Sequence, residues 1–415
     1  MALDPREGLQ EHSQFKGLRN NVPVDRFELG DLSVAQNVDI DDSERVTRRF
    51  GHGSAVVSGA CKSLWSDGRV AFAVQSETNL VEILPTYATI TLRTGLTSGL
   101  DMTYVPMAGR VYYSNGAENG VIEGGQSRSW GITPPSDQPV ASEVGGVLPA
   151  GRYQFAVTYL RADGQESGTP RAGFIDLAAM GGIALSSIPV PADTGITSKA
   201  VYFSKCNGET LYRAGLVSVA ATTFTYATEA SLQIPLMTQH LRPPPAGALI
   251  GRFGARLLVA TGNELYPSEP YAPELFDLRK VKRFDSRITM LETVDSRAEG
   301  TWLGTEDAVV WLRGESPEKW TYDVAADYGV IPGTLAYIEG ETLGEGAPKG
   351  SAVAFFATTQ GLCYGTPDGN LENLTRDRFA YPIQDKGAAI VRRHRGMVQG
   401  LVAMRGAEQA ANVSS

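Results

Sequence analysis

Histidine and cysteine, which proteins often use as metal ligands and nucleophiles, are scarce and widely spaced in this sequence. They are His12, His52, His240, His394, Cys61, Cys206 and Cys363. No two of them have the spacing of a metal-binding motif, and neither a Gly-x-Ser-x-Gly elbow nor a Walker loop occurs. We therefore expect buried free thiols, no metal site and no cofactor.

The carboxylate side chains are compatible with one class of enzyme, the glycosidases. A glycosidase needs two carboxyl groups about 5 to 10 Å apart, and spacing along the chain does not report that separation. Asp101, Glu269 and Asp295 are arbitrary candidates, because such residues are more often found in turns and at strand ends. The 5 tryptophans are expected in hydrophobic cores rather than in a sugar site.

Two clusters of basic residues are candidates for contacts with other molecules. The clusters are Arg279, Lys280, Lys282 and Arg283, and then Arg392, Arg393 and Arg395. The first cluster could contact phosphate, and a charged strand edge that resists edge pairing is the alternative for it. The second cluster, on an acidic chain, suits an acidic protein neighbour or DNA. We expect both clusters to face neighbouring proteins.

The composition is acidic and rich in turn-forming residues. The 37 Lys and Arg residues stand against 46 Asp and Glu residues, so the formal net charge is −9. This balance argues against a nucleic-acid binder with a basic face, although it is compatible with DNA that slides past. The 46 glycines and 23 prolines favour short strands joined by tight turns. No apolar stretch has the length of a membrane span, so no membrane-spanning segment is expected.

Short apolar runs separated by turn residues repeat along most of the chain. Between residues 61 and 84, three such runs alternate with Ser66-Asp67-Gly68 and Glu77-Thr78-Asn79, which predicts an antiparallel meander. Similar groups recur about every 35 to 50 residues, the period of β-propeller blades. Between residues 144 and 226 the runs are longer and alternate at period two, as in a β-sandwich.

The sequence therefore predicts an all-β fold, namely an irregular β-propeller of about five or six blades with an inserted immunoglobulin- or fibronectin-like β-sandwich. The predicted domains are an extended N-terminal arm (1–29), an N-terminal propeller segment (30–141), the sandwich (142–240), a C-terminal propeller segment (241–405) and a flexible tail (406–415). The hairpin at Leu32–Phe50 is expected to pair with the last strands near Ile390–Met404, because that pairing would remove exposed edges.

Several motifs, taken in order, resemble those of β-propeller proteins in the tails of short-tailed bacteriophages. They are Leu32–Ile40 with Arg48-Arg49-Phe50-Gly51, Tyr112–Gly116, Trp130–Pro135, Gly151–Tyr159 with Gly164–Ser167, Arg256–Tyr266 with Ser268-Glu269-Pro270, and Val310–Gly314. Members of this family are known as tail hub, nozzle, DNA-stabilisation or tail accessory proteins. The order of the motifs carries more weight than any one of them.

The resemblance implies a structural, non-enzymatic virion protein. Such a protein forms a homo-oligomeric ring, usually a homohexamer, that extends the portal–adaptor channel, seals it and guides DNA ejection. The implied partners are the portal or adaptor and the tail fibre or spike proteins, while DNA passes without specific binding. The implied location is the virion tail, after assembly in the host cytoplasm.

Two other classes of function stay open. One is a propeller glycosidase that acts on host surface polysaccharide, and the other is a glycan-binding propeller that recognises the host surface. Hydrolysis or binding of such glycans would favour these classes, whereas six copies on a portal would favour the tail hub.

Overall fold

The computed structural model of the chain describes residues 14–36, 38–40, 43–49, 53–229, 234–292, 300–340, 352–381, 384–394 and 397–406. Strands make up 52% and helices 3% of the structure, which confirms the all-β prediction. The helices with described bounds are single 3₁₀ turns: η1 (Val24–Arg26), η2 (Leu278–Lys280) and η3 (Pro317–Lys319). No helix within these ranges is long and apolar enough to cross a membrane.

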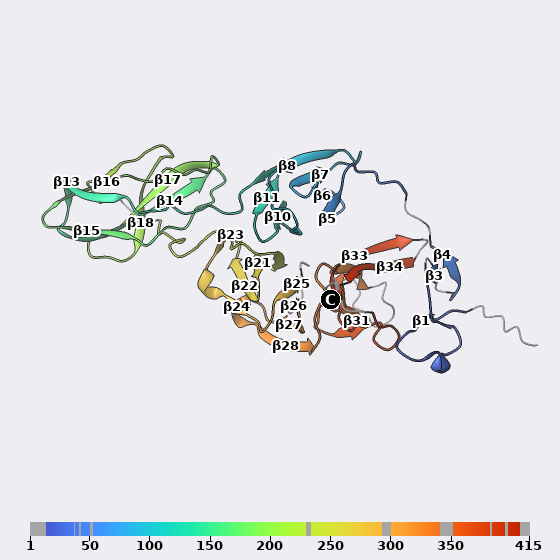
Figure 1. Cartoon of the computed structure of the whole chain (residues 1–415). Coiled ribbons are helices and arrows are strands. Elements are labelled where there is room, and N and C mark those ends of the chain that lie inside the picture. Colours follow the sequence, from blue (N-terminus) through green and yellow to red (C-terminus); the bar gives the residue numbers. More distant parts are fainter. Residues whose placement is uncertain are drawn as a thin grey trace, which may run out of the picture. The chain divides into compact units, whose positions relative to one another are not determined.

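The chain divides into two compact units, and Figure 1 labels many of their strands. The central unit is Ala60–Arg283, and the terminal unit combines Met1–Gly59 with Phe284–Ser415. The domain boundaries expected from the sequence follow changes in strand length instead, and they stay predictions. Each unit is described by itself.

Three antiparallel meanders form the part of the central unit outside residues 140–226, and each places consecutive strands side by side. The first contains β5 (Cys61–Ser66), β6 (Ala71–Gln75), β7 (Asn79–Ile83) and β8 (Thr89–Arg93). The second contains β9 (Thr103–Met107), β10 (Arg110–Ser114), β11 (Asn119–Glu123) and β12 (Gln126–Arg128). The third contains β20 (Leu249–Phe253), β21 (Arg256–Thr261), β22 (Glu264–Glu269) and β23 (Ala272–Phe276), with β24 (Lys282–Arg283) paired to β22.

Side-chain hydrogen bonds and glycine stabilise the tight turns between strands, as in the β5–β6 turn. The Asp67 carboxylate accepts hydrogen bonds from the backbone N–H groups of Arg69 and Val70, at 2.9 and 3.0 Å. Gly68 has a φ of +85°, a conformation that glycine adopts without the cost of a side-chain clash. The turn predicted at Ser66-Asp67-Gly68 is therefore confirmed.

Buried side chains tie neighbouring meanders of the central unit together. The cluster of the first two meanders includes Phe72, Leu80 and Tyr113, with Trp65 packed against it. A second cluster joins β9–β12 to β20–β23 and centres on Trp130, whose indole N–H donates to the Pro273 carbonyl oxygen at 2.8 Å. The two clusters hold segments that lie far apart in sequence in one arrangement.

Residues 140–226 form two further antiparallel sheets. One has the order β13 (Val140–Leu148), β16 (Gly181–Ser186), β19 (Phe224–Tyr226). The other has the order β15 (Gly173–Leu177), β14 (Gly151–Arg161), β17 (Ile196–Ser204), β18 (Leu211–Ser218). Both sheets contribute to one hydrophobic cluster, in which Phe203 stacks on Tyr226 with ring centroids 4.4 Å apart.

The terminal unit contains two more meanders. The first has β25 (Ile288–Leu291), β26 (Gly300–Thr305), β27 (Val309–Arg313) and β28 (Thr321–Ala326). The second has β29 (Ala336–Glu339), β30 (Ala352–Thr358), β31 (Gly361–Gly365) and β32 (Leu371–Asn373). Their shared core contains Trp302 and Trp311, with ring centroids 4.9 Å apart, together with Phe356 and Cys363.

Short sheets complete the terminal unit. Parallel strands β1 (Gly17–Leu18) and β2 (Asp31–Leu32) pair with each other, as do antiparallel β3 (Val38–Ile40) and β4 (Val46–Arg48). The last hairpin is β33 (Gln384–His394) with β34 (Met397–Gly406).

The prediction that the hairpin at residues 32–50 pairs with the last strands is wrong for the described residues. Strands β3 and β4 form a sheet of their own, and so do β33 and β34. A side-chain ion pair links the two hairpins instead, with Arg392 Nη2 3.5 Å from Asp39 Oδ2. Each hairpin satisfies the backbone hydrogen bonds between its own strands, so the hairpins are joined through side chains.

Candidate functional site

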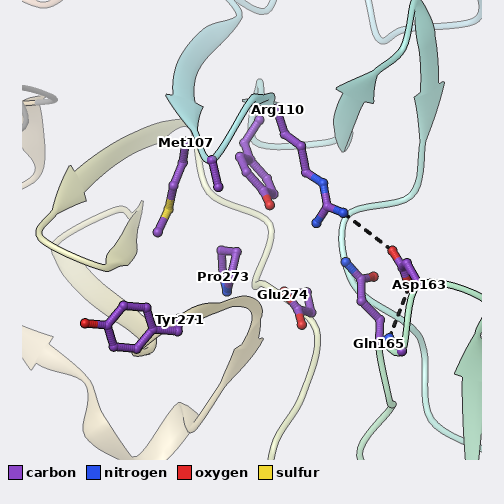
Figure 2. A pocket seen from close by; sticks show the side chains of 10 residues that line it. Met107, Arg110, Asp163, Gln165, Tyr271, Pro273 and Glu274 are labelled. Carbon is purple, nitrogen blue, oxygen red and sulfur yellow. Dashed lines mark hydrogen bonds and ion pairs between the residues drawn. The ribbon is translucent and has the colours of Figure 1, made fainter.

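A pocket of about 310 Å³ opens in the central unit where three turns meet (Figure 2). The β9–β10 hairpin contributes Met107 and Arg110, and the turn after β14 contributes Asp163 and Gln165. The third wall is the β22–β23 turn with the start of β23, which contributes three residues. They are Tyr271, Pro273 and Glu274. The volume lies at the lower end of the range for ligand sites.

Arg110 and Asp163, which line the pocket, form an ion-pair network with Glu123 and Arg128, which do not. Arg110 Nε lies 2.9 Å from Glu123 Oε1 and its Nη2 lies 3.7 Å from Asp163 Oδ2. Arg128 Nη2 lies 3.1 Å from both Glu123 and Asp163. Hydrogen bonds from Arg110 and Arg128 hold the pKa of Glu123 below its usual range. Within this network the two positive charges are balanced by two negative charges.

Glu274 is the second carboxylate in the lining of the pocket, after Asp163. Within the described residues, its side chain forms no hydrogen bond to another residue and no ion pair within 4.0 Å. Its half-buried position raises its pKa, because burial disfavours the charged form. The charged residues of the lining are therefore Arg110, Asp163 and Glu274, which amount to a formal charge of −1 when all of them are ionised.

Tyr271 gives the rim of the pocket an aromatic ring. The residue is 88% exposed, so the ring is open to solvent beside Met107 and Pro273 (Figure 2). Tyr271 follows Pro270 in the β22–β23 turn and has a φ of +59°. A positive φ after proline is typical of a type II turn, whose second central residue is usually glycine or asparagine. Tyrosine at this position costs conformational energy.

The turn after β14 is fixed by its own side chains. Arg161 donates to Gln165 Oε1 and to Asp193 Oδ2, both at 2.8 Å, and also to the carbonyl oxygens of Ser129 and Gly131. Its side chain is 5% exposed. This buried guanidinium joins the turn, and with it Asp163, to the segment that follows β12.

The neighbouring motif residues Glu166 and Ser167 also have structural contacts. Glu166 accepts hydrogen bonds from Thr158 Oγ1 at 2.5 Å and from the Tyr202 hydroxyl at 2.7 Å. The Tyr159 backbone N–H donates to Ser167 Oγ at 2.9 Å. The Gly164–Ser167 motif thus stabilises the hairpin whose turn forms one wall of the pocket.

The first predicted basic cluster lies at η2 and β24, and three of its members are ion-paired. Arg279 bonds to Asp277 through Nε and Nη2 at 2.8 Å, Lys280 Nζ lies 2.6 Å from Glu269, and Arg283 Nε lies 2.8 Å from Glu264. Lys282 pairs through its backbone with Leu265. That these residues face a neighbouring protein stays a prediction.

The second predicted basic cluster lies on the last hairpin. Arg392 Nε donates to Gln399 Oε1 at 2.8 Å and also pairs with Asp39, while Arg393 forms an ion pair with Glu339. Arg395 lies outside the described residues. The described members of the two clusters are not among the residues that line the pocket, and the proposed interface role of this cluster also stays a prediction.

The cysteines, tryptophans and acidic residues considered in the sequence analysis lie at several different places in the fold. Cys363 is buried and Cys206 is partly buried, but Cys61 is exposed, so the expectation of buried thiols is wrong for Cys61, which starts an edge strand. Trp65, Trp130, Trp302 and Trp311 pack in or against hydrophobic clusters, as predicted. Glu269 is ion-paired to Lys280, and Asp295 lies outside the described residues.

The sequence does not single out Arg110, Asp163, Tyr271 or Glu274, because they come from segments far apart in the chain. One local signal was available, since a bulky residue directly after the turn proline Pro270 occupies a place where glycine or asparagine is usual. Among the described residues, no group of three or more His, Cys, Asp or Glu side chains has an arrangement that could hold a metal ion.

Comparisons with known proteins yield no family for the chain. No protein-family model matches the sequence, and no curated protein matches it. Among solved structures, the chain is similar to a crystal structure of BBS1N in complex with ARL6DN, at 9% identity and a TM-score of 0.34 over 86% of this chain and 96% of that chain. It is also similar to Citrobacter koseri AztD, at 11% identity and a TM-score of 0.27 over 82% and 91%. TM-scores this low establish neither a shared fold nor a shared function.

Proposed function

We propose that the chain is a structural protein of a bacteriophage tail, a hub or nozzle subunit that extends the portal–adaptor channel and guides DNA ejection. The proposal starts from the ordered series of motifs that resembles the tail hub family. It includes a homohexameric ring in the virion tail that contacts the portal or adaptor and the fibre or spike proteins. In this role the protein performs no catalysis.

The observation that carries the proposal is the repeated meander. Five groups of four consecutive strands form antiparallel sheets: β5–β8, β9–β12, β20–β23, β25–β28 and β29–β32. Repetition of such sheets is typical of β-propeller blades, so we infer an irregular propeller. The seven strands β13–β19, in two sheets around one core, support an inserted immunoglobulin- or fibronectin-like sandwich.

The motif residues support a structural role because they make contacts within the fold. Arg49 Nε in the first motif lies 2.8 Å from Asp39 Oδ1. The Tyr113 hydroxyl lies 2.6 Å from Ser127 Oγ, and it also accepts from Arg93 at 3.1 Å. Trp130, as described above, is anchored in the core. Residues that stabilise elements are what a rigid subunit of a multiprotein channel requires.

The test is assembly on a portal. The purified full-length chain is mixed with the portal–adaptor complex of the phage whose genome carries its coding sequence, and the product is examined by native mass spectrometry and electron microscopy. We expect six copies in a ring at the end of the channel. One or three copies per particle would overturn the hub proposal and favour a fibre or receptor-binding role.

Glycan hydrolysis is the second candidate function, and one observation favours it. Asp163 and Glu274 line the same pocket, where Asp163 is ion-paired to arginines and burial raises the pKa of Glu274. Glycosidases use a pair of carboxyl groups in one site, whose different surroundings give them different roles. Release of reducing ends from host surface polysaccharide, abolished by Glu274→Gln, would establish this function. No release from any polysaccharide of the host would exclude it.

A further inference from the structure

We propose that the pocket between the β9–β10 hairpin, the turn after β14 and the β22–β23 turn binds an alkylguanidinium or alkylammonium group. Glu274 would receive the cation, and the ring of Tyr271 would cover it. This inference does not depend on the role of the chain in a phage tail. It concerns the pocket alone.

The charge of the pocket favours a positively charged ligand. Arg110 and Arg128 are both within ion-pair distance of Glu123 and Asp163, so these four groups satisfy one another. Glu274 forms no hydrogen bond and no ion pair within 4.0 Å among the described residues, and Arg110 and Arg128 act on it only through longer-range electrostatic attraction. A positive group that enters the pocket would complete the balance and recover part of the free energy that burial costs the carboxylate.

The aromatic rim selects the same class of ligand. Guanidinium and ammonium groups are attracted to the faces of aromatic rings as well as to carboxylates. Tyr271 is almost fully exposed, and its backbone is held in the left-handed region, with its N–H donating to the Ala255 carbonyl oxygen at 3.0 Å. Tyr271 and Glu274 line the same pocket on opposite sides of Pro273 (Figure 2), so a cation at the carboxylate would meet the ring across Pro273.

The apolar wall suits an alkyl chain. Met107 is 8% exposed, and Pro273 is buried; both lie beside Tyr271 in the pocket (Figure 2). These side chains would pack against methylene groups, while the charged end reaches Glu274. A side chain such as that of arginine or lysine, or a free amine of similar length, has this combination of an apolar stem and a charged end.

The experiment measures binding to the full chain by saturation-transfer difference NMR and titration calorimetry. The probes are butylguanidinium, butylammonium, the neutral isostere N-butylurea, inorganic phosphate and the capped tripeptide Gly-Arg-Gly. We expect the two cations and the tripeptide to bind, and N-butylurea to bind at least about tenfold more weakly. A tripeptide that binds more tightly than butylguanidinium would identify a protein side chain as the natural ligand, and equal affinities would identify a free amine.

Two variants test the assigned residues. Glu274→Gln is expected to weaken cation binding about tenfold or more, and Glu143→Gln, which changes a carboxylate on β13 outside the pocket, is expected to leave it unchanged. Tyr271→Gly removes the ring and also suits the positive φ, so this variant should unfold at the same or a higher temperature while it binds more weakly. Loss of binding without loss of stability separates a binding role from a structural one.

Several results would overturn the proposal. Binding of N-butylurea as tightly as butylguanidinium would show that charge does not matter. Phosphate binding that excludes the cations would show that the arginines receive an anion instead. Unchanged cation affinity in both Glu274→Gln and Tyr271→Gly would place the ligand elsewhere.

Discussion

Glu292 is a carboxyl group that the fold places almost entirely out of solvent. It follows β25 and is 6% exposed, and its Oε2 accepts the backbone N–H of Trp302 at 2.8 Å. Burial raises the pKa of Glu292 to about 7. The folded protein therefore holds a proton that the unfolded chain releases near the ordinary carboxyl value, so this stabilisation is complete in acid and is lost as pH rises towards 7.

The first prediction follows from this loss of stability with rising pH. The free energy of unfolding should fall by about 3 kcal/mol between about pH 4 and pH 7 because of Glu292, and Glu292→Gln should remove this fall. The amide oxygen can still accept from Trp302, so the variant should be the more stable protein at pH 8. Urea unfolding at pH 5 and pH 8 measures both effects, with Glu306→Gln, an exposed carboxylate paired to Arg287, as the control. Equal pH slopes in Glu292→Gln and the wild type would contradict the prediction.

The second prediction concerns Arg161, the buried guanidinium at the end of β14. Arg161→Met should lower the free energy of unfolding of the central unit by about 3 kcal/mol, since the Asp193 carboxylate and the carbonyl oxygens of Ser129 and Gly131 lose their donor. Differential scanning calorimetry measures the loss. Arg152→Met is the matched control, because Arg152 lies in the same strand but pairs with Asp176 in the open, with both side chains 56% exposed. An equal loss of unfolding free energy in the two variants would show that the burial of Arg161 does not add to its contribution.

At the scale of the element, the described part of the N-terminal segment is attached to its own unit. Asp31, whose side chain is fully buried, lies 2.8 Å from Arg19 Nη1 and 2.6 Å from Arg378 Nη2. Asn20 exchanges two hydrogen bonds of 2.7 Å with the backbone of Ala380. Strands β1 and β2 are two residues long, so these side chains provide much of what holds residues 17–32 in place.

The third prediction is that Asp31→Asn releases this segment. Hydrogen bonds from Arg19 hold the pKa of Asp31 below its usual range, so the attachment is present at neutral pH and is lost in acid as the carboxylate is protonated. Amide hydrogen exchange of β1 and β2 should speed up in Asp31→Asn at pH 7, while Asp25→Asn, on the exposed η1 turn, should leave it unchanged. The prediction fails if exchange in β1 and β2 is the same in both variants.

Elements with clear local signals could be predicted from the sequence. The turn at Asp67-Gly68 and the apolar runs on either side of it specify β5 and β6, because side-chain capping and a positive φ are local properties. Strand β16 has a weaker local signal, because it begins with Gly181 and Gly182, and glycine in a strand reflects a close approach of another backbone. Gly182 tolerates no side chain because a Cβ there would lie 2.8 Å from the Gly145 carbonyl oxygen and 3.1 Å from the Cα of Ala227.

Contacts between distant elements could not be predicted in the same way. The pocket depends on Arg110, Asp163 and Glu274 meeting, and only the packing of three sheets brings them together. The expected pairing of the first and last hairpins failed for the same reason. The alternation of apolar and polar residues along a strand indicates which face is buried, but it does not identify the neighbouring strand. Here an ion pair between Arg392 and Asp39 connects the two hairpins instead of strand pairing.

At the scale of the whole molecule, the distribution of charge determines whether the proposed ring would bind DNA or let it pass. The single chain carries −9, so six copies in the proposed ring would carry six times as much, or −54. The basic cluster at η2 and β24 does not reverse this balance, because Asp277, Glu269 and Glu264 pair with Arg279, Lys280 and Arg283. A channel with this net charge would let DNA slide, since the excess of carboxylates repels the phosphates.

The last prediction tests whether these three carboxylates suppress DNA binding. The triple variant Glu264→Gln, Glu269→Gln and Asp277→Asn should bind duplex DNA at low salt, with a log–log salt slope of about −3 if about three phosphates are contacted, whereas the wild type should bind weakly. Fluorescence anisotropy from 20 to 200 mM salt, roughly the range over which counterion release is measurable, gives both values. Asp176→Asn, Glu306→Gln and Asp323→Asn together remove the same number of carboxylates from arginines that belong to no cluster, so this control should stay weak. Tight, salt-sensitive binding by the wild type would show that the protein holds DNA rather than letting it pass.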